Sequence, residues 1–190
     1  MKVDHEERRH QIAEAVVRIA ASRGLQAASM REVAAEAGVS LRLVQYYFHT
    51  KQELLAGVLT YLSEQIGRRV ARRVAELGEP STPRSFLYEA LTALLPTDEE
   101  SRRIVLAYTA HFTLTLTDPD QAAAGVSYAN ALRDVVTEQF SQAQVSGDPR
   151  TRAAVTLALV SGLQLGVLVG QYTGEEAVAL LTAHLDEALG

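Results

Sequence analysis

Residues 29–55 read SMREVAAEAGVSLRLVQYYFHTKQELL, and this stretch decides how the chain is interpreted. Ser29, followed three residues later by Glu32, has the pattern of a capping box, which starts a helix. Gly38 suits the left-handed position that ends a helix, because glycine has no Cβ atom. Ser40 is placed to cap a second short helix. Two short helices joined by a tight glycine-containing turn predict a helix-turn-helix.

The second helix of this motif has the chemistry of a DNA major-groove reader. Arg42 can bond guanine edges and Gln45 can bond adenine edges, and the amphipathic Tyr46 projects beside them. Tyr47 and Lys51 follow at the helix end, where hydroxyl and ammonium groups can meet phosphates. The alternative is a plain helical hairpin with exposed polar residues. The capping box, the glycine turn, the clustered aromatic residues and the terminal lysine together disfavour that alternative.

At these residues the sequence resembles the TetR family of transcriptional regulators. The matching segments are residues 23–24, 29–34, 37–40, 46–48 and 51–55. The resemblance implies a repressor that binds double-stranded operator DNA as a dimer. It also implies that the repressor dissociates from the DNA when a small ligand binds in the larger C-terminal domain. It also implies DNA contacts at Ser40, Tyr46, Tyr47 and Lys51. Gln45 stands where the family often has an aromatic residue, so Arg42 and Gln45 are assigned from their own chemistry alone.

The distribution of charged residues makes the N-terminal part of the chain slightly basic and the rest acidic. Residues 1–51 carry eight Lys and Arg against six Asp and Glu, whereas residues 52–190 carry ten against seventeen. This asymmetry suits a phosphate-binding end joined to a different domain, although chance asymmetry is an alternative. The chain has no cysteine, which excludes disulfides, thiolate zinc sites and a catalytic thiol.

Apolar periodicity and helix-start signals predict an all-α chain with about nine helices. We expect helices near residues 5–23, 30–37, 41–47, 51–77, 83–95, 98–117, 119–145, 149–172 and 175–189. The predicted architecture is an N-terminal three-helix helix-turn-helix domain at 1–50 and a larger helical ligand-binding and dimerisation domain at 51–190. The arginine pairs Arg68-Arg69 and Arg72-Arg73 are interpreted as a solvated face of the long fourth helix, with nucleic-acid contact as the alternative.

Residues 153–174 contain no charged side chain, and Gly162, Gly166 and Gly170 recur within them at four-residue spacing. A membrane span is one interpretation of such a run. Polar residues inside the run, Thr156, Ser161, Gln164 and Gln171, disfavour a span. We expect a buried helix that pairs with residues 175–189 across a two-fold axis, with the glycines allowing close approach. Residues 1–10 are polar and charged, unlike a secretory signal peptide. The protein is therefore expected to be a cytoplasmic homodimer without membrane contact.

Polar and aromatic residues on otherwise apolar helices predict a site for a small, mainly apolar effector. Tyr108, His111 and Phe112 lie within two turns of one expected helix. Tyr128 and Gln164 lie on two others. The alternative for each residue is an ordinary core position with a satisfied polar group.

An enzyme and a membrane-associated helical protein are the competing classes. The sequence lacks a glycine-rich phosphate loop, a dinucleotide fingerprint and a nucleophile elbow. The five histidines are His5, His10, His49, His111 and His184, and no two have metal-ligand spacing such as i, i+4. We therefore expect no catalytic residue, no metal and no cofactor.

Overall fold

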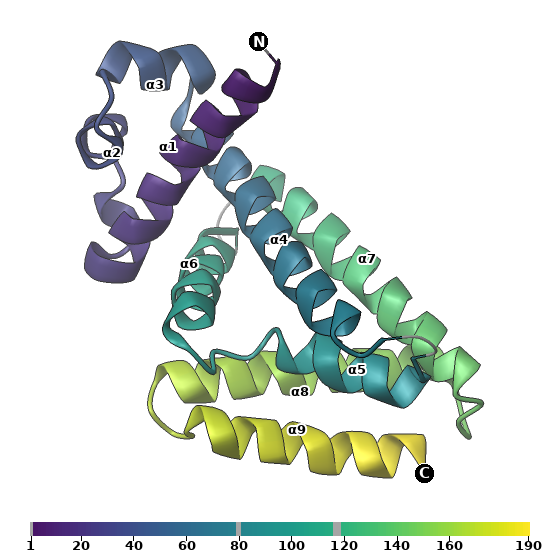
Figure 1. Cartoon of the computed structure of the whole chain (residues 1–190). Helices are drawn as coiled ribbons and strands as arrows, with labels where there is room; N and C mark the ends of the chain where they lie inside the picture. Colours follow the sequence, from purple (N-terminus) through teal and green to yellow (C-terminus); the bar gives the residue numbers. More distant parts are fainter. Residues whose placement is uncertain (1, 79–80, 116–118) are drawn as a thin grey trace. The chain divides into compact units, whose positions relative to one another are not determined.

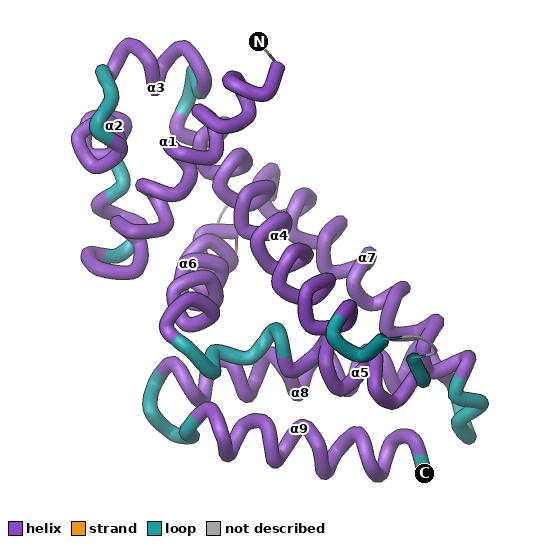
Figure 2. The backbone as a smooth tube through the Cα atoms, in the orientation of Figure 1, coloured by secondary structure: helices purple, strands orange, loops and turns teal. Residues whose placement is uncertain are grey.

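The structure is a computed structural model that describes residues 2–78, 81–115 and 119–190. These residues form nine α-helices and one 3-10 helix, and none of them lies in a strand (Figures 1 and 2). The elements are α1 Lys2–Arg23, η1 Leu25–Ala27, α2 Met30–Ala37, α3 Leu41–Tyr47, α4 Lys51–Ala75, α5 Pro83–Thr92, α6 Glu99–Thr115, α7 Pro119–Gln142, α8 Pro149–Leu168 and α9 Gly174–Leu189. The predicted all-α class and helix-turn-helix are confirmed.

The chain divides into two compact units. The first is Met1–Gln65 with Leu106–Gly125, and the second is Ile66–Val105 with Val126–Gly190. The unit that holds the helix-turn-helix therefore extends past the expected boundary at residue 50. The physical reason is that α4 is one continuous helix, and its first half carries fully buried Leu54 and Leu62.

The first unit is organised around one apolar face of α1. Ile12, Val16 and Ile19 have no exposed surface, and α1 packs against η1 and α2 (Figure 1). The helix-turn-helix starts as expected, because the Ser29 hydroxyl accepts a hydrogen bond from the Glu32 N–H at 3.2 Å. Only this half of the expected capping box forms. The Glu32 carboxylate pairs with Arg23 at 3.0 Å instead of returning to the cap residue.

Gly38 ends α2 in the way that the sequence predicts. Its φ of 67° is left-handed, and its N–H donates to the carbonyl oxygens of Ala34 and Ala35. A residue with a Cβ atom is strained in this conformation. The glycine therefore turns the chain tightly enough for α3 to pack on α2.

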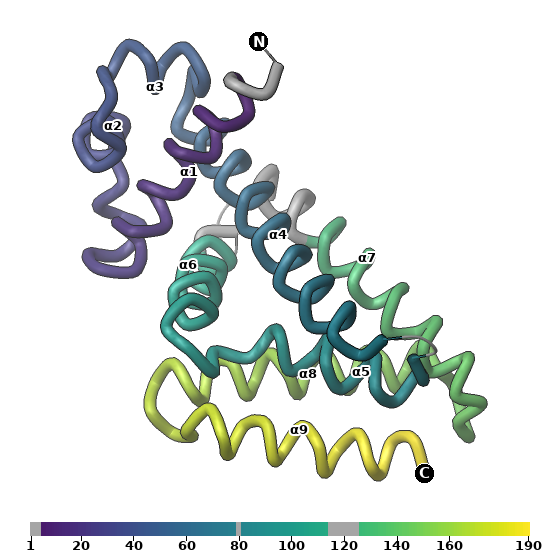
Figure 3. Tube along the Cα trace, viewed as in Figure 1, coloured from purple at the N-terminus to yellow at the C-terminus, as the bar shows by residue number. Residues whose placement is uncertain are grey.

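The second unit has a leucine-rich core made by α5, α7, α8 and α9. In Figure 3, α5 and α9 lie side by side although they are far apart in the sequence, and the contacts between them agree. The buried residues are Leu87, Leu91, Leu94, Leu95, Val136, Phe140, Ala153, Val160, Leu163, Val167, Ala177, Leu181, Leu185 and Ala188. This core fixes α8 and α9 as an antiparallel pair.

α7 and α8 end earlier than expected, because the residue two positions after each helix has a left-handed backbone conformation. α8 ends at Leu168 rather than near residue 172, since Gly170 has a φ of 80°. α7 ends at Gln142 rather than near residue 145, since Gln144 has a φ of 53°. Left-handed residues cannot continue a right-handed helix.

The interpretation of the α4 arginines as a uniformly solvated face is wrong for Arg69. This side chain is only 8% exposed, and its Nε donates to the carbonyl oxygen of Ala93 at 3.0 Å. It also pairs with Asp98. Burial opposes ionisation of Asp98, but hydrogen bonds from Ser101 and Arg69 hold the pKa of its carboxyl below the usual value. A guanidinium is tolerated in this core because its donors are paired there.

α8 is the one helix among the described residues that is long and apolar enough to cross a membrane by length and composition. A core helix passes the same test, and one face of α8 is embedded in the second unit. Gly166 lies on that face, where an added Cβ atom would stand 2.5 Å from the Tyr172 ring. The expectation that Gly166 allows a partner subunit to approach is therefore wrong, because this position is filled by its own chain.

Candidate functional site

The helix α3 is held by two apolar anchors and leaves its other face open. Val44 is fully buried and Phe48, which follows the helix, is 1% exposed. The Phe48 ring lies directly over Gly57 of α4, where an added Cβ atom would stand 2.4 Å from the ring. The missing side chain at Gly57 therefore lets the end of α3 pack closely on the start of α4.

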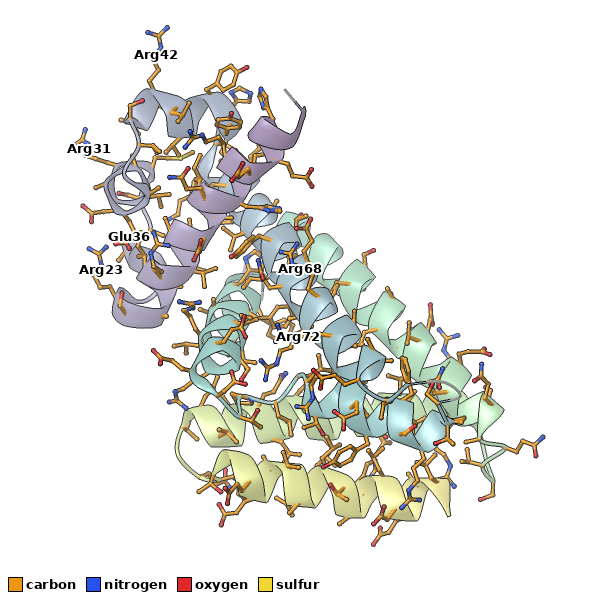
Figure 4. The ribbon with its side chains drawn as sticks, in the orientation of Figure 1. Arg23, Arg31, Glu36, Arg42, Arg68 and Arg72 are labelled. Atoms are coloured by element: carbon orange, nitrogen blue, oxygen red, sulfur yellow. The ribbon has the colours of Figure 1, made fainter. Side chains whose placement is uncertain are left out.

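Most of the side chains expected to read DNA point away from these anchors. Arg42, Gln45 and Lys51 are exposed, and Tyr46 has 62% of its surface exposed. Figure 4 shows Arg42 extending outward from α3. The structure therefore brings the predicted base-reading and phosphate-binding groups to one small helix and the start of the next.

Ser40 caps α3 as predicted, and Tyr47 is less exposed than a residue expected to contact phosphate. The Ser40 hydroxyl caps α3 by accepting a hydrogen bond from the Leu43 N–H at 3.1 Å. Tyr47 is half-buried, and its ring makes an edge contact with Tyr46 at a centroid distance of 5.2 Å. The Ser40 hydroxyl is therefore used to start α3, the predicted DNA-reading helix.

Two residues of α1 that the sequence analysis did not assign hold the end of α3. The His5 ring lies 5.0 Å from the Tyr47 ring and 5.9 Å from the Tyr46 ring. Arg9 donates to the carbonyl oxygen of Tyr47 at 2.9 Å and stacks over Phe48. No local pattern reveals these contacts, because they join segments about forty residues apart in the chain.

A further basic residue, Arg31, also belongs to this surface. Arg31 is exposed on α2 and extends outward in Figure 4. It lines a shallow groove that also includes Leu41 and Gln45 of α3. Its position two residues after the Ser29 cap is the sequence signal that points to this placement.

The start of α4 is tightly capped. The Thr50 hydroxyl accepts from the Glu53 N–H at 3.0 Å, and the Glu53 carboxylate accepts from the His49 N–H at 2.9 Å. Lys51 is the first residue of the helix and is exposed. A lysine beside exposed helix N–H groups suits a phosphate oxygen, because both the ammonium and the helix dipole favour negative charge.

His111 of α6 stands out among the residues expected to bind an effector. Its side chain is 2% exposed, and among the described residues no hydrogen-bond partner meets either ring nitrogen. Burial lowers the pKa of His111 and raises the pKa of Tyr108, so both groups are held neutral. The two residues are three apart on one helix and therefore share a face. An imidazole that is buried without a hydrogen bond costs stability.

The other three expected effector residues are placed differently. Phe112 is 54% exposed on α6, and Tyr128 is half-buried on α7. Gln164 of α8 donates from its Nε2 to the carbonyl oxygen of Leu94 at 2.8 Å, which joins α8 to the segment that follows α5. Tyr128 and Gln164 belong to the second compact unit, whereas Tyr108, His111 and Phe112 belong to the first.

α8 carries a second apolar face opposite the one in the core. Val155 and Leu165 are more than half exposed, and so is Val169 just beyond the helix end. Together with exposed Ala158 and Gly162 they recur every three or four residues, and we call these five residues the outward stripe. On the neighbouring helix α9, Leu180 is 44% exposed. Exposed apolar residues that gather on one face of a helix are typical of interaction surfaces.

Comparisons with known proteins match most of the chain. Residues 12–58 match the bacterial regulatory proteins of the tetR family, and residues 83–190 match the C-terminal region of BetI-type transcriptional repressors. The chain is 31% identical to the HTH-type transcriptional regulator PksA of Bacillus subtilis over 174 residues, which are 88% of this chain and 82% of PksA.

Two solved structures have the same fold. A transcriptional regulator from Rhodococcus sp. RHA1 superposes with a TM-score of 0.85 at 29% identity, covering 95% of each chain. The multidrug binding protein EbrR in complex with ethidium superposes with a TM-score of 0.67 at 27% identity, covering 93% of this chain and 98% of EbrR.

Proposed function

Because this chain belongs to the TetR family of DNA-binding transcriptional repressors, we propose that it binds a pseudo-palindromic operator as a homodimer and releases it when a small, mainly apolar effector binds. One observation supports the DNA-binding step above all. The short helix α3 exposes Arg42 and Gln45 while buried Val44 and Phe48 anchor its other side. We place the protein in the cytoplasm, where operator DNA is accessible.

The side chains divide into two roles on the duplex. Arg42 and Gln45 read base edges in the major groove, where bidentate contacts to guanine and adenine carry sequence information. Tyr46 packs beside them at the groove. Tyr47, Lys51 and the capped turn at Ser40 meet phosphates, which set register without selecting sequence.

The two faces of α8 support the proposed homodimer. One stripe, at residues 153, 156, 160, 163 and 167, is buried inside the chain, and the outward stripe is exposed opposite to it. A helix with apolar residues on both sides needs a second partner for the exposed side. We propose that α8 and α9 pair with their copies around a two-fold axis as a four-helix bundle, covering the outward stripe.

The effector is proposed to bind against α6 at Tyr108 and His111. The neutral His111 ring offers one donor and one acceptor in an apolar setting, which suits a ligand with one or two polar groups on a mainly apolar body. The ethidium bound by EbrR is a largely aromatic molecule, which agrees with this class of ligand. Phe112 stays a proposed member of this site, whereas Tyr128 and Gln164, which belong to the other compact unit, stay predictions from the sequence.

Release requires that the effector prefer a conformation whose reader helices no longer match the DNA. Only a difference in affinity between two conformations shifts their populations. By linkage, operator DNA weakens effector binding by the same factor, typically ~1–3 kcal/mol of coupling free energy. Equal effector affinity with and without operator would contradict the coupling.

Selection of binding sites from random duplexes tests the DNA-binding proposal directly. Purified protein should enrich an inverted repeat whose half-sites lie ~34 Å apart or a multiple of one DNA turn. Gln45→Ala should then relax the base preference at one position by ~1–3 kcal/mol. Lys51→Ala should weaken all sequences alike and reduce the salt dependence by about one phosphate contact. No enriched motif, or a changed base preference in Lys51→Ala, would reject these roles.

A further inference from the structure

Three metal-ligating side chains meet beside the DNA-reading helices. Glu6 and His10 lie four residues apart on α1, and Glu64 lies on α4. One ligand atom from each lies within 4.8 Å of the other two, and His10 Nε2 stands 2.9 Å from Glu64 Oε2. We propose that these three residues bind a divalent transition-metal ion of the Zn²⁺ class. None of them belongs to the proposed DNA or effector site.

The two helices place these ligands without distortion. Residues four apart on a helix share a face, so Glu6 and His10 both point toward α4 from α1. The His10 ring packs against Tyr61 with a centroid distance of 5.4 Å, which holds the imidazole beside Glu64 one turn further along α4. This packing restricts the rotamers of the His10 side chain in the metal-free protein, which lowers the conformational entropy lost when a metal ion binds.

The site has room for an ion with its remaining water ligands. Glu6, His10 and Glu64 line a cavity of about 130 Å³ together with Thr60 and Tyr61. A water molecule occupies roughly 30 Å³ in the liquid, so a metal ion and one or two waters fit this volume. Arg9 lines the same cavity, but its guanidinium lies over Phe48 and donates to the Tyr47 carbonyl oxygen.

The donor set selects the class of metal. Two carboxylate oxygens within 4.8 Å of one another repel, and a cation between them would relieve that repulsion. One imidazole nitrogen and two carboxylate oxygens form a borderline set that favours Zn²⁺, Fe²⁺ or Ni²⁺ over Mg²⁺, which prefers oxygen ligands alone. Zn²⁺ binds such ligands at about 2.0–2.2 Å. Small rotations of the three side chains would bring their ligand atoms to this distance from a central ion.

A metal ion bound to these residues would link α1 to α4 within the first compact unit. The same two turns of α1 carry His5 and Arg9, which hold the end of α3 through Tyr46, Tyr47 and Phe48. Fixing α1 would restrict these contacts to one arrangement. Metal binding is therefore expected to raise the thermal stability of the protein and to increase operator affinity, because less order is lost when DNA binds.

The test is a Co²⁺ titration of the untagged full-length protein, followed by visible d–d absorption, with Zn²⁺ as the competitor. We expect one saturable site that Zn²⁺ displaces and Mg²⁺ does not. Glu6→Gln, His10→Gln and Glu64→Gln should each weaken Co²⁺ binding by about tenfold or more and abolish the increase in Tm with Zn²⁺. The matched controls are Glu7→Gln on the same helix and His49→Gln, which should bind the metal as the unaltered protein does.

Glu6→Gln is the deciding variant, because Glu6 is exposed and its replacement leaves the packing of His10 and Glu64 in place. If His10→Gln or Glu64→Gln fails to fold, Glu6→Gln still separates the two outcomes. Unchanged Co²⁺ binding in Glu6→Gln would overturn the proposal. So would the absence of a saturable site in the unaltered protein, or equal loss of binding in His49→Gln.

Discussion

Arg9 Nη1 donates a hydrogen bond to the carbonyl oxygen of Tyr47 at 2.9 Å, and this contact joins α1 to the last residue of the reader helix. The same guanidinium lies 4.4 Å from the centre of the Phe48 ring. Carbonyl groups at the end of a helix have no partner within the helix, so an arginine here completes α3 and orients it. Arg9, a residue of α1, therefore helps to position the predicted DNA-reading helix α3.

Arg9→Gln should weaken operator binding without changing base preference. The variant loses the charged hydrogen bond and the stacking on Phe48, so α3 is held less firmly against α1. Arg8→Gln is the matched control, because it removes the same charge one residue earlier, where the guanidinium bonds Gln11 on the surface. Anisotropy titrations with the selected operator and with point variants of it measure both effects. Equal losses in the two variants would show that charge alone is responsible.

Gly57→Ala should destabilise the protein, whereas Gly67→Ala on the same helix should not. A Cβ atom at Gly57 would stand 2.4 Å from the buried Phe48 ring, but nothing lies within 4 Å of a Cβ atom at Gly67. Overpacking of a core costs about 1–3 kcal/mol. Alanine at an open helical position gains about 0.5–1 kcal/mol over glycine. Urea unfolding of the two variants should therefore move in opposite directions, and a stable Gly57→Ala would disprove the close packing.

Leu165→Glu should convert the dimer to a folded monomer. Leu165 lies in the outward stripe, where a carboxylate would be buried without a partner on association. Val135→Glu is the control, because this valine is exposed to a similar extent on α7 outside the stripe. Sedimentation velocity gives the oligomeric state and circular dichroism verifies that both variants remain helical. A dimeric Leu165→Glu protein would place the interface elsewhere.

His111→Leu should stabilise the protein while removing its response to effector. No described residue bonds the His111 ring, so replacing this buried imidazole with an apolar side chain of similar size relieves a desolvation penalty of about 1–3 kcal/mol. The comparison is made by urea unfolding and by effector titration of the operator complex. A variant that is both less stable and fully responsive would remove His111 from the effector site.

The stability difference between the unaltered protein and His111→Leu should widen at acidic pH. Burial lowers the pKa of His111 in the folded chain below its ordinary value of about 6.5. Above that pH the ring is neutral in both states and no proton is exchanged on unfolding. Below it the unfolded chain binds a proton that the folded chain does not, so the unaltered protein loses stability as the pH falls. Unfolding midpoints measured at a series of pH values from neutral to acidic test this, and parallel curves would contradict it.

The reader motif could be predicted from sequence because its signals are local. Ser29, Gly38 and Ser40 act on backbone groups within four residues, and their positions suffice to start, end and restart a helix. The exposure of Arg42 and Gln45 follows from the same periodicity, since Val44 and Phe48 occupy the opposite face. Local chemistry of this kind does not depend on what the rest of the chain does.

Tertiary structure decided everything that depends on which distant segments meet. The sequence does not reveal that Arg69 is buried against Ala93 and Asp98 while Arg68 and Arg72 stay exposed. It does not assign the space beside Gly166 to Tyr172 rather than to a partner subunit. Nor does it bring Glu64 to His10, or leave His111 buried without a partner among the described residues. A charged, small or titratable residue has no fixed role of its own, because its energy is set by the dielectric and the partners that folding places around it.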